Sequence, residues 1–198
     1  MVKLFISEHQ RYMRRYNLKG NSHLYYSVPC PYCGAEKGKP CHRNSGHWYP
    51  PHVERIRRTW QAQNTKHHIF VYGTLKRGFS NHTRLLSKAE FLGEAVSVDR
   101  DYQMIAHGVP FLAKVAPGGI GLPVKGELFA VTGQEFAACD RLEGHPHNYC
   151  RKEHMFQLPN GKQIKAWVYL CPHRFEYVGS KQFLIKPTNG FIEWRPNW

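Results

Sequence analysis

Residues 70–78 read FVYGTLKRG, an apolar run that enters a Gly-Thr turn and continues into Lys-Arg-Gly. A short, nearly continuous apolar run of this kind is typical of a buried strand. Gly73 allows the backbone to approach a neighbouring group closely, because it lacks a Cβ atom. We therefore expect a strand followed by a turn that presents backbone groups. Taken alone, the pattern also fits an ordinary strand–turn–helix connection.

Around this segment the chain alternates between short strands and two helices. Strands are expected at HIFVYGT (68–74), FLGEAVSV (91–98), FLAKVAP (111–117), PVKGELFAV (123–131), EHMFQLP (153–159) and QIKAWVYLC (163–171). Helical spacing covers NHTRLLSKAE (81–90) and TGQEFAACDRLEG (132–144), the latter capped by Thr132. Asn160-Gly161 predicts a hairpin turn between the last two strands. This pattern predicts an α/β (α+β) domain with a closed or nearly closed sheet and helices packed outside it.

Length and charge divide the chain of 198 residues into a small module at 1–66 and a domain at 67–198. The first 66 residues hold 12 Lys and Arg against 3 Asp and Glu, a net charge of +9 out of +14 for the whole chain. Such an excess fits a polyanionic partner such as DNA or RNA, and equally a solvated basic face. The stretch AQNTKHH (62–68) is expected to be the linker.

Hydropathy predicts a cytoplasmic protein without a membrane span. No stretch reaches the roughly 18 uninterrupted apolar residues of a spanning helix, and charges interrupt the N-terminus where a signal peptide has its apolar run. Six cysteines in the cytoplasm remain reduced, so the close spacing of three of them points to metal rather than to disulfides.

The segment CPYCGAEKGKPCHRNSGHWYPPH (30–52) has the spacing C-x2-C-x7-C-x10-H. Cys30, Cys33, Cys41 and His52 therefore form a candidate Cys3His zinc site. The alternative is three buried cysteines without metal. For the fourth ligand, His42 is disfavoured because it adjoins Cys41, His47 is sterically possible, and His52 is preferred because it precedes a predicted helix in PPHVERIRRTWQAQ (50–63).

Basic side chains flank this candidate site on both sides. A short helix is expected from Ser7 to near Gly20 with Arg11, Arg14 and Arg15, and the later helix carries Arg55, Arg57 and Arg58. Each arginine is a candidate phosphate contact or a solvated surface charge. The motifs CPYCGA, GKPC and PHVERIRR resemble the zinc-finger domains of phage and actinobacterial proteins. The resemblance implies a DNA-binding module, a phage origin and, for a phage-encoded chain, the host cytoplasm.

The remaining two-thirds of the chain carries a second resemblance. FVYGTLKRGFSNH (70–82), VKGELFAVTGQEFAACDRLEGHPHNYCRKEHMFQL (124–158) and AWVYL (166–170) resemble the gamma-glutamylcyclotransferase-like superfamily, within it the gamma-glutamylaminecyclotransferases. The resemblance implies an enzyme in which the α-amine of a gamma-glutamyl group attacks its own γ-carbonyl, giving 5-oxoproline and a free amine. The substrate would be a small gamma-glutamyl amine or peptide. No cofactor is needed for this chemistry, so zinc would be structural.

The same resemblance assigns roles to individual residues. Tyr72, Gly73, Thr74 and Leu75 would hold the glutamyl group, and Glu143 would be the proton-transferring catalytic residue, with Asp140 structural. Tyr149 and Arg151 match a Tyr-x-Arg element that would line the pocket; alternatively Tyr149 is core and Arg151 an ion-pair partner. His82, His107, His145, His147, Cys139 and Cys150 are given no catalytic role.

Three functions remain open at the level of sequence. The first is a cyclotransferase joined to a zinc module, the second a non-catalytic nucleic-acid-binding protein on the same fold, and the third an enzyme acting on modified nucleic acid. An ionisable Glu143 that faces the YGTL turn would favour an enzyme, whereas a blocked pocket and a continuous basic surface would favour a binding protein. The segments GVPFLAKVAPGGIGLP (108–123) and TNGFIEWRPNW (188–198) leave substrate choice open.

Overall fold

The computed structural model describes residues 25–42, 48–49, 51–171 and 184–195. The chain divides into two compact units, Met1–Asn64 and Thr65–Trp198. The helix expected over residues 7–20 and the alternative ligand His47 lie outside the described residues. No helix in the described part of the chain is long and apolar enough to cross a membrane.

The described residues of the first unit form two short strands and one longer helix. Strands β1 (Cys41–His42) and β2 (Trp48–Tyr49) pair antiparallel, and helix α3 (Val53–Asn64) follows. One face of α3 is buried through Arg55, Ile56 and Thr59, which follow a helical spacing. The helix predicted after Pro51 is therefore present.

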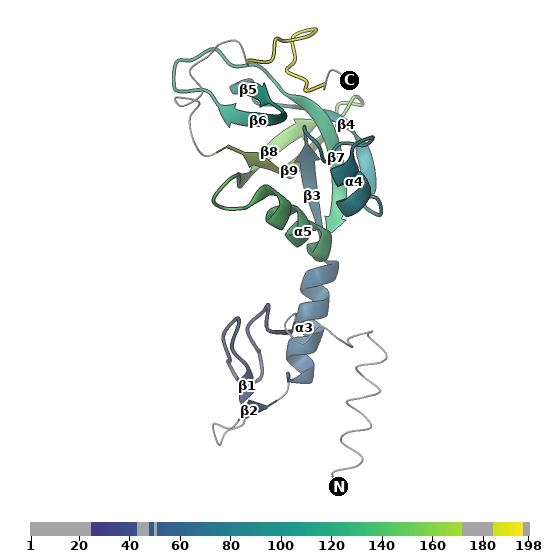
Figure 1. The fold of residues 1–198 in the computed structure, drawn as a ribbon. Coiled ribbons are helices and arrows are strands. Elements are labelled where there is room, and N and C mark those ends of the chain that lie inside the picture. The colour runs from purple at the N-terminus through teal and green to yellow at the C-terminus, as the bar shows by residue number, and fades with distance from the viewer. Residues whose placement is uncertain (1–24, 43–47, 50, 172–183, 196–198) are drawn as a thin grey trace. The chain divides into compact units, whose positions relative to one another are not determined.

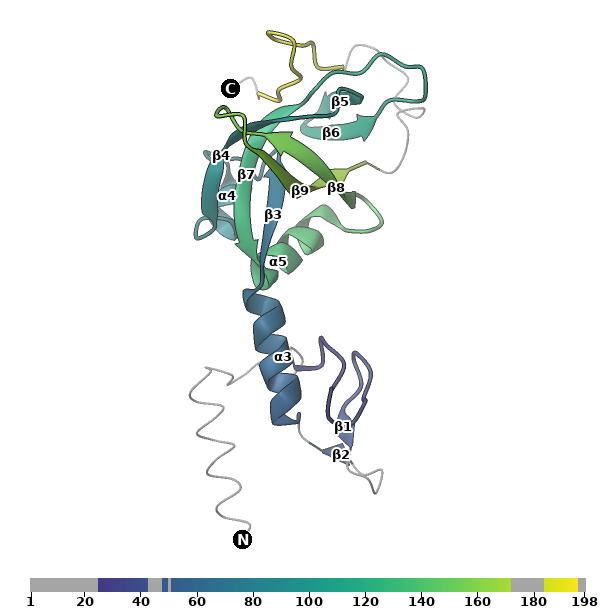
Figure 2. The ribbon, with the colours of Figure 1, turned by 180° about the vertical axis from the view of Figure 1, so that it is seen from behind.

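Five strands of the second unit form a closed barrel in the order β3–β7–β4–β8–β9 (Figures 1 and 2). They are β3 (Lys66–Val71), β4 (Glu90–Ser97), β7 (Lys125–Thr132), β8 (Cys150–Gln157) and β9 (Gln163–Leu170). All pairs are antiparallel except β3 with β9, and this parallel pair closes the barrel. The predicted mixed α/β fold with a closed sheet is confirmed.

Two helices and a hairpin complete the second unit. Helix α4 (Ser80–Leu85) follows β3, and α5 (Gly133–Glu143) follows β7. The capping box that Thr132 forms with Glu135 is present as predicted: the Thr132 hydroxyl accepts from the Glu135 N–H, and the Glu135 carboxylate accepts from the Thr132 N–H. Strands β5 (Tyr102–His107) and β6 (Val109–Lys114) form a separate hairpin beside β8 and β9 (Figures 1 and 2).

The sequence did not predict three features of this arrangement correctly. The helix expected over residues 81–90 ends at Leu85, and strand β4 begins at Glu90. The stretch 62–68 is not a linker, because α3 extends to Asn64 and β3 begins at Lys66. Strand β5 was missed altogether. Its partner β6 begins immediately after Gly108, whose φ of +74° makes the tight turn that joins the two strands.

Residues 184–195, which the structure describes after β9, contribute side chains to the barrel's core. Ile192 and Trp194 are buried, and Ile192 exchanges backbone hydrogen bonds with Pro123 and Lys125. The buried Lys76 ammonium donates to the carbonyl of Trp194 over 2.8 Å. Since Lys76 follows the YGTL turn directly, this hydrogen bond anchors the turn to the segment that contains Trp194.

Candidate active site and candidate metal centre

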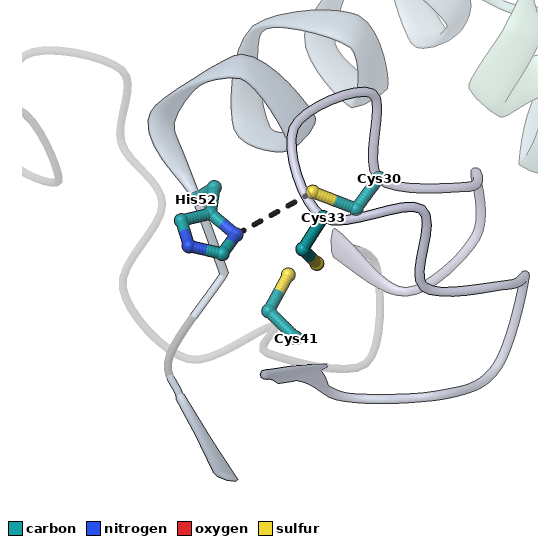
Figure 3. A group of neighbouring side chains, drawn as sticks. All are labelled: Cys30, Cys33, Cys41 and His52. Carbon is teal, nitrogen blue, oxygen red and sulfur yellow. Dashed lines mark hydrogen bonds between the residues drawn. The ribbon is translucent and has the colours of Figure 1, made fainter. Parts of the chain in front are cut away.

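Four potential metal ligands of the first unit converge on one point. The Sγ atoms of Cys30, Cys33 and Cys41 and a ring nitrogen of His52 all lie within 4.8 Å of one another (Figure 3). His42, the adjacent alternative, has an exposed side chain and is not part of this group. The structure thus assembles the four residues that the spacing predicted.

The geometry of this cluster fits a tetrahedral zinc ion. With Zn–S near 2.3 Å and Zn–N near 2.0 Å, a sulfur and a nitrogen ligand should be about 3.5 Å apart. The distance between Cys30 Sγ and His52 Nδ1 is 3.5 Å. The pKa of Cys33 is lowered to about 6: burial raises it, but hydrogen bonds from the backbone of His42 and Ala35 and from the neighbouring thiols outweigh burial. A lowered thiol pKa suits a zinc ligand, which binds as thiolate.

Local backbone structure places these ligands. A tight turn closes over the first two cysteines, with the Cys30 N–H donating to Ala35 O over 2.8 Å and the Gly34 N–H donating to Cys30 O over 3.0 Å. Gly34 adopts a φ of +69°, which favours glycine. His52 directly precedes α3, where its carbonyl accepts from the Ile56 N–H. The beginning of the helix therefore fixes the fourth ligand.

In the second unit, a cavity of about 190 Å³ lies where the YGTL turn, the end of α5 and the β5–β6 hairpin meet. Its lining is mostly apolar, with a few polar groups, as in many small-molecule sites. The lining residues are Phe70, Val71, Tyr72, Gly73, Thr74, Leu75, Asn81, Val109, Pro110, Leu142, Glu143, Tyr149 and Tyr169.

The YGTL turn lines this cavity and contains backbone donors that no described group uses. Within the described part of the chain, the N–H groups of Gly73, Thr74 and Leu75 have no hydrogen-bond partner. Gly73 is required here, because an added Cβ atom would lie 2.8 Å from Pro110 Cγ. The Thr74 hydroxyl accepts from Asn81 Nδ2 over 2.9 Å, which ties the turn to α4. Such a run of free N–H groups can receive a carboxylate or an oxyanion.

Glu143 is the last residue of α5 and the one carboxylate among the lining residues. Gly144 ends the helix in the left-handed conformation, with φ of +61°. Burial raises the pKa of Glu143 to about 7, and no hydrogen bond or ion pair to a described residue counteracts it. A carboxylate with these properties can accept and return a proton near neutral pH.

Asp140, one turn earlier on α5, has the opposite environment. Its carboxylate forms an ion pair with Arg151 and accepts a hydrogen bond of 2.8 Å from the Tyr169 hydroxyl. The Arg151 guanidinium also lies over the Phe136 ring, 4.3 Å from its centroid. These contacts fasten α5 to β8 and β9, and Asp140 is not among the residues that line the cavity.

Comparison with known families identifies the larger domain. Residues 69–187 match the profile of the family described as gamma-glutamyl cyclotransferase, AIG2-like. The chain belongs to this family.

Individual relatives agree with that assignment to the gamma-glutamyl cyclotransferases. Gamma-glutamylaminecyclotransferase C of Danio rerio is 36% identical over 129 residues, which are 62% of this chain and 84% of the relative. Gamma-glutamylaminecyclotransferase of Mus musculus is 39% identical over 115 residues, which are 52% and 76% of the two chains. The crystal structure of an AIG2-like protein from Mus musculus superposes with a TM-score of 0.52 at 26% identity, covering 68% of this chain and 98% of that one.

The N-terminal unit matches a different family. Residues 7–68 match the profile described as "Putative DNA-binding phage zinc finger domain". This match and the Cys3His cluster agree in indicating a zinc-binding module ahead of the cyclotransferase-family domain.

The structure brings most of the predicted site residues together. Tyr72, Gly73, Thr74, Leu75, Tyr149 and Glu143 line the cavity, whereas Arg151 does not. The Tyr72 hydroxyl donates to Tyr169 O over 2.8 Å, and the Tyr149 hydroxyl donates to Pro110 O over 3.2 Å. Both phenols therefore also join neighbouring segments of the cavity lining. Burial raises the pKa of both phenols above the ordinary value.

Some lining residues were not found from the sequence. Asn81 carried a usable signal, since it is a polar residue in the first turn of the helix that follows the YGTL motif. Val109 and Pro110 carried none, because the hairpin that brings them to the cavity was not recognised.

Arg55 was named as a candidate phosphate contact, but the structure buries it completely. Arg57 and Arg58 are exposed.

Proposed function

We propose that residues 67–198 catalyse the conversion of a gamma-glutamyl amine or amide into 5-oxoproline and a free amine. The observation that carries this proposal is Glu143, a carboxylate that no described residue pairs with, in a cavity also lined by the YGTL turn, whose backbone donors likewise have no partner among the described residues. Family membership supports the reaction class, and the names of the relatives in zebrafish and mouse support an amine as the leaving group.

In this proposal the YGTL turn orients the substrate. The N–H groups of Gly73, Thr74 and Leu75 receive the negatively charged part of the glutamyl group, so that its α-amine can approach its own γ-carbonyl. Holding two reacting groups of one molecule in this way contributes roughly 7–11 kcal/mol to lowering the barrier. Tyr149 contributes a wall of the cavity rather than a charge.

Glu143 moves the proton. It takes a proton from the attacking amine as the new C–N bond forms, and it returns the proton to the departing nitrogen as the old C–N bond breaks. A pKa of about 7 suits both steps, because acid and base forms are similarly populated near neutral pH. No step uses zinc or another cofactor, so the Cys3His site has a structural role.

The test is turnover of gamma-glutamyl-ε-lysine, gamma-glutamyl dipeptides and glutathione, with detection of 5-oxoproline. Glu143→Gln keeps the shape of the side chain and removes the base, so turnover should fall by at least about 100-fold while substrate still binds. Glu153→Gln is the matched control, since this glutamate is exposed and pairs with Lys165 over 2.7 Å. It should retain wild-type turnover. Equal activity of the Glu143 and Glu153 variants would refute the assignment.

We also propose that residues 1–66 bind DNA or RNA. The match to a phage zinc finger domain, the net charge of +9 and the exposed Arg57 and Arg58 support this, and the same match supports a phage origin. Binding of the full chain should weaken steeply with salt, because phosphate contacts release counterions. A chain starting at residue 65 should lose this binding. Equal binding by a truncated chain that retains its circular dichroism would overturn the proposal.

A nucleic-acid substrate would combine the two proposals. If the module delivers the enzyme to nucleic acid with a glutamyl- or amine-modified base, such a polymer should yield 5-oxoproline while free gamma-glutamyl amines react slowly. A full chain inactive on every gamma-glutamyl compound, yet bound to nucleic acid, would favour a non-catalytic binding protein.

A further inference from the structure

Arg55 is an unusual residue in the zinc-binding module, because its side chain is completely buried. Arginine is almost never fully buried unless an anion pairs with it. Among the described residues, no aspartate or glutamate forms an ion pair with Arg55, since the carboxylates that pair with a base all lie in the second unit. A buried positive charge without a negative partner is costly, so the counter-charge must lie elsewhere.

The contacts of the guanidinium identify that counter-charge. Nε donates to Val28 O over 3.0 Å, Nη1 to Lys39 O over 2.8 Å and Nη2 to Glu36 O over 3.0 Å. Nη1 also contacts Cys41 Sγ at 3.4 Å. The three carbonyls satisfy hydrogen bonds but carry no net charge, which leaves the sulfur as the anionic candidate.

The charge balance of the candidate zinc site also indicates that Cys41 Sγ carries the negative charge next to Arg55. Zinc with three thiolates and one neutral histidine carries a net charge of −1, which a single guanidinium neutralises. We propose that Arg55 is the counter-charge of the zinc–thiolate centre and acts through Cys41 as a positioning residue. Arg55 at the same time contacts the Cys41 sulfur, closes the loop of residues 28–39 and joins that loop to α3. The inference goes beyond the proposed activities and depends on zinc at the Cys3His site, not on cyclotransferase activity or nucleic-acid binding.

The experiment separates charge from hydrogen bonding in the full-length chain. Arg55→Lys keeps the positive charge but cannot reach all the carbonyls, and Arg55→Gln keeps an amide donor without charge. Zinc affinity is measured by competition with a chromophoric chelator. Loss of a partner group around a metal site commonly lowers metal affinity about 10- to 100-fold, so Arg55→Gln should fall in that range and Arg55→Lys should lie closer to wild type. Arg57→Gln, an exposed arginine of the same helix, should match wild type.

Cobalt substitution supplies a readout that a merely structural role would not change. Positive charge beside a thiolate lowers the energy of its electrons, so the sulfur-to-cobalt charge-transfer band of the Arg55→Gln protein should move to longer wavelength, and the band of Arg55→Lys should move less. Lower affinity of the lysine variant than of the glutamine variant, or wild-type affinity and spectrum in both, would overturn the proposal. A wild-type chain that binds no zinc would overturn it as well.

Discussion

Each domain holds a charged side chain at its candidate site, Arg55 in the first and Glu143 in the second, and the surroundings of these two charges are opposite. In the zinc-binding module, Arg55 is fully buried, and its guanidinium contacts three carbonyls and a cysteine sulfur. In the cyclotransferase-family domain, Glu143 faces a cavity, and no described residue pairs with its carboxylate. The Arg55 charge is therefore suited to hold structure, whereas the Glu143 charge is available for reaction.

A second comparison within α5 separates the same two uses of charge. Asp140 and Glu143 lie one turn apart on this helix, yet Asp140 is paired with Arg151 and Tyr169. The neighbouring elements, not the residue type, thus decide which carboxylate holds the helix and which can exchange protons. Each prediction below changes one of these charges or its partner.

The largest expected effect is loss of the metal. Cys33→Ala should abolish stoichiometric zinc binding and unfold residues 28–60, because structural zinc contributes about 10–16 kcal/mol to folding in zinc-finger peptides. It also removes the counter-charge of Arg55. Metal analysis and limited proteolysis would show the loss, and the barrel should stay resistant to protease. Zinc retained at one ion per chain would contradict the assignment of Cys33 as a ligand.

A moderate effect is expected from breaking the paired charge on α5. Asp140→Asn leaves the partly buried Arg151 without its counter-charge, so the free energy of unfolding should fall by about 1–3 kcal/mol. Denaturant melts would measure it. Turnover should fall much less than in Glu143→Gln, since Asp140 does not line the cavity. Loss of turnover with unchanged stability would reverse the roles given to these two residues.

The smallest expected effect is a pH-dependent change in stability that comes from the Glu143 carboxylate. The pKa of Glu143 is raised from 4.5 to about 7 by burial, so the folded state binds more protons than the unfolded state between these values. The stabilising contribution of the protonated form is present below about pH 4.5 and is lost as the pH rises through about 7. Glu143→Gln should therefore melt at a higher temperature than wild type at pH 8, and the difference should shrink at pH 5. Melting curves at both pH values test this, and a lower melting temperature at pH 8 would indicate a hidden partner for Glu143.

The sequence by itself determined the elements whose signals are local. The metal ligands are set by the spacing of Cys30, Cys33 and Cys41 and by the helix start after His52. Strands β3, β7 and β9 carry apolar runs, and the cap of α5 requires just Thr132 and Glu135. Such signals depend on residues a few positions apart, and neighbouring chain segments cannot easily override them.

Only the tertiary structure decided how charges far apart in sequence are paired. The β5–β6 hairpin brings Pro110 against Gly73, and closure of the barrel brings Tyr169 and Arg151 to Asp140. From the sequence, Arg55 was expected to be exposed, either as a phosphate contact or as a solvated surface charge. In the folded chain, the loop of residues 28–39 surrounds it with carbonyl acceptors. The energy of a buried charge depends on every group packed around it, and these groups are assembled only when the chain folds.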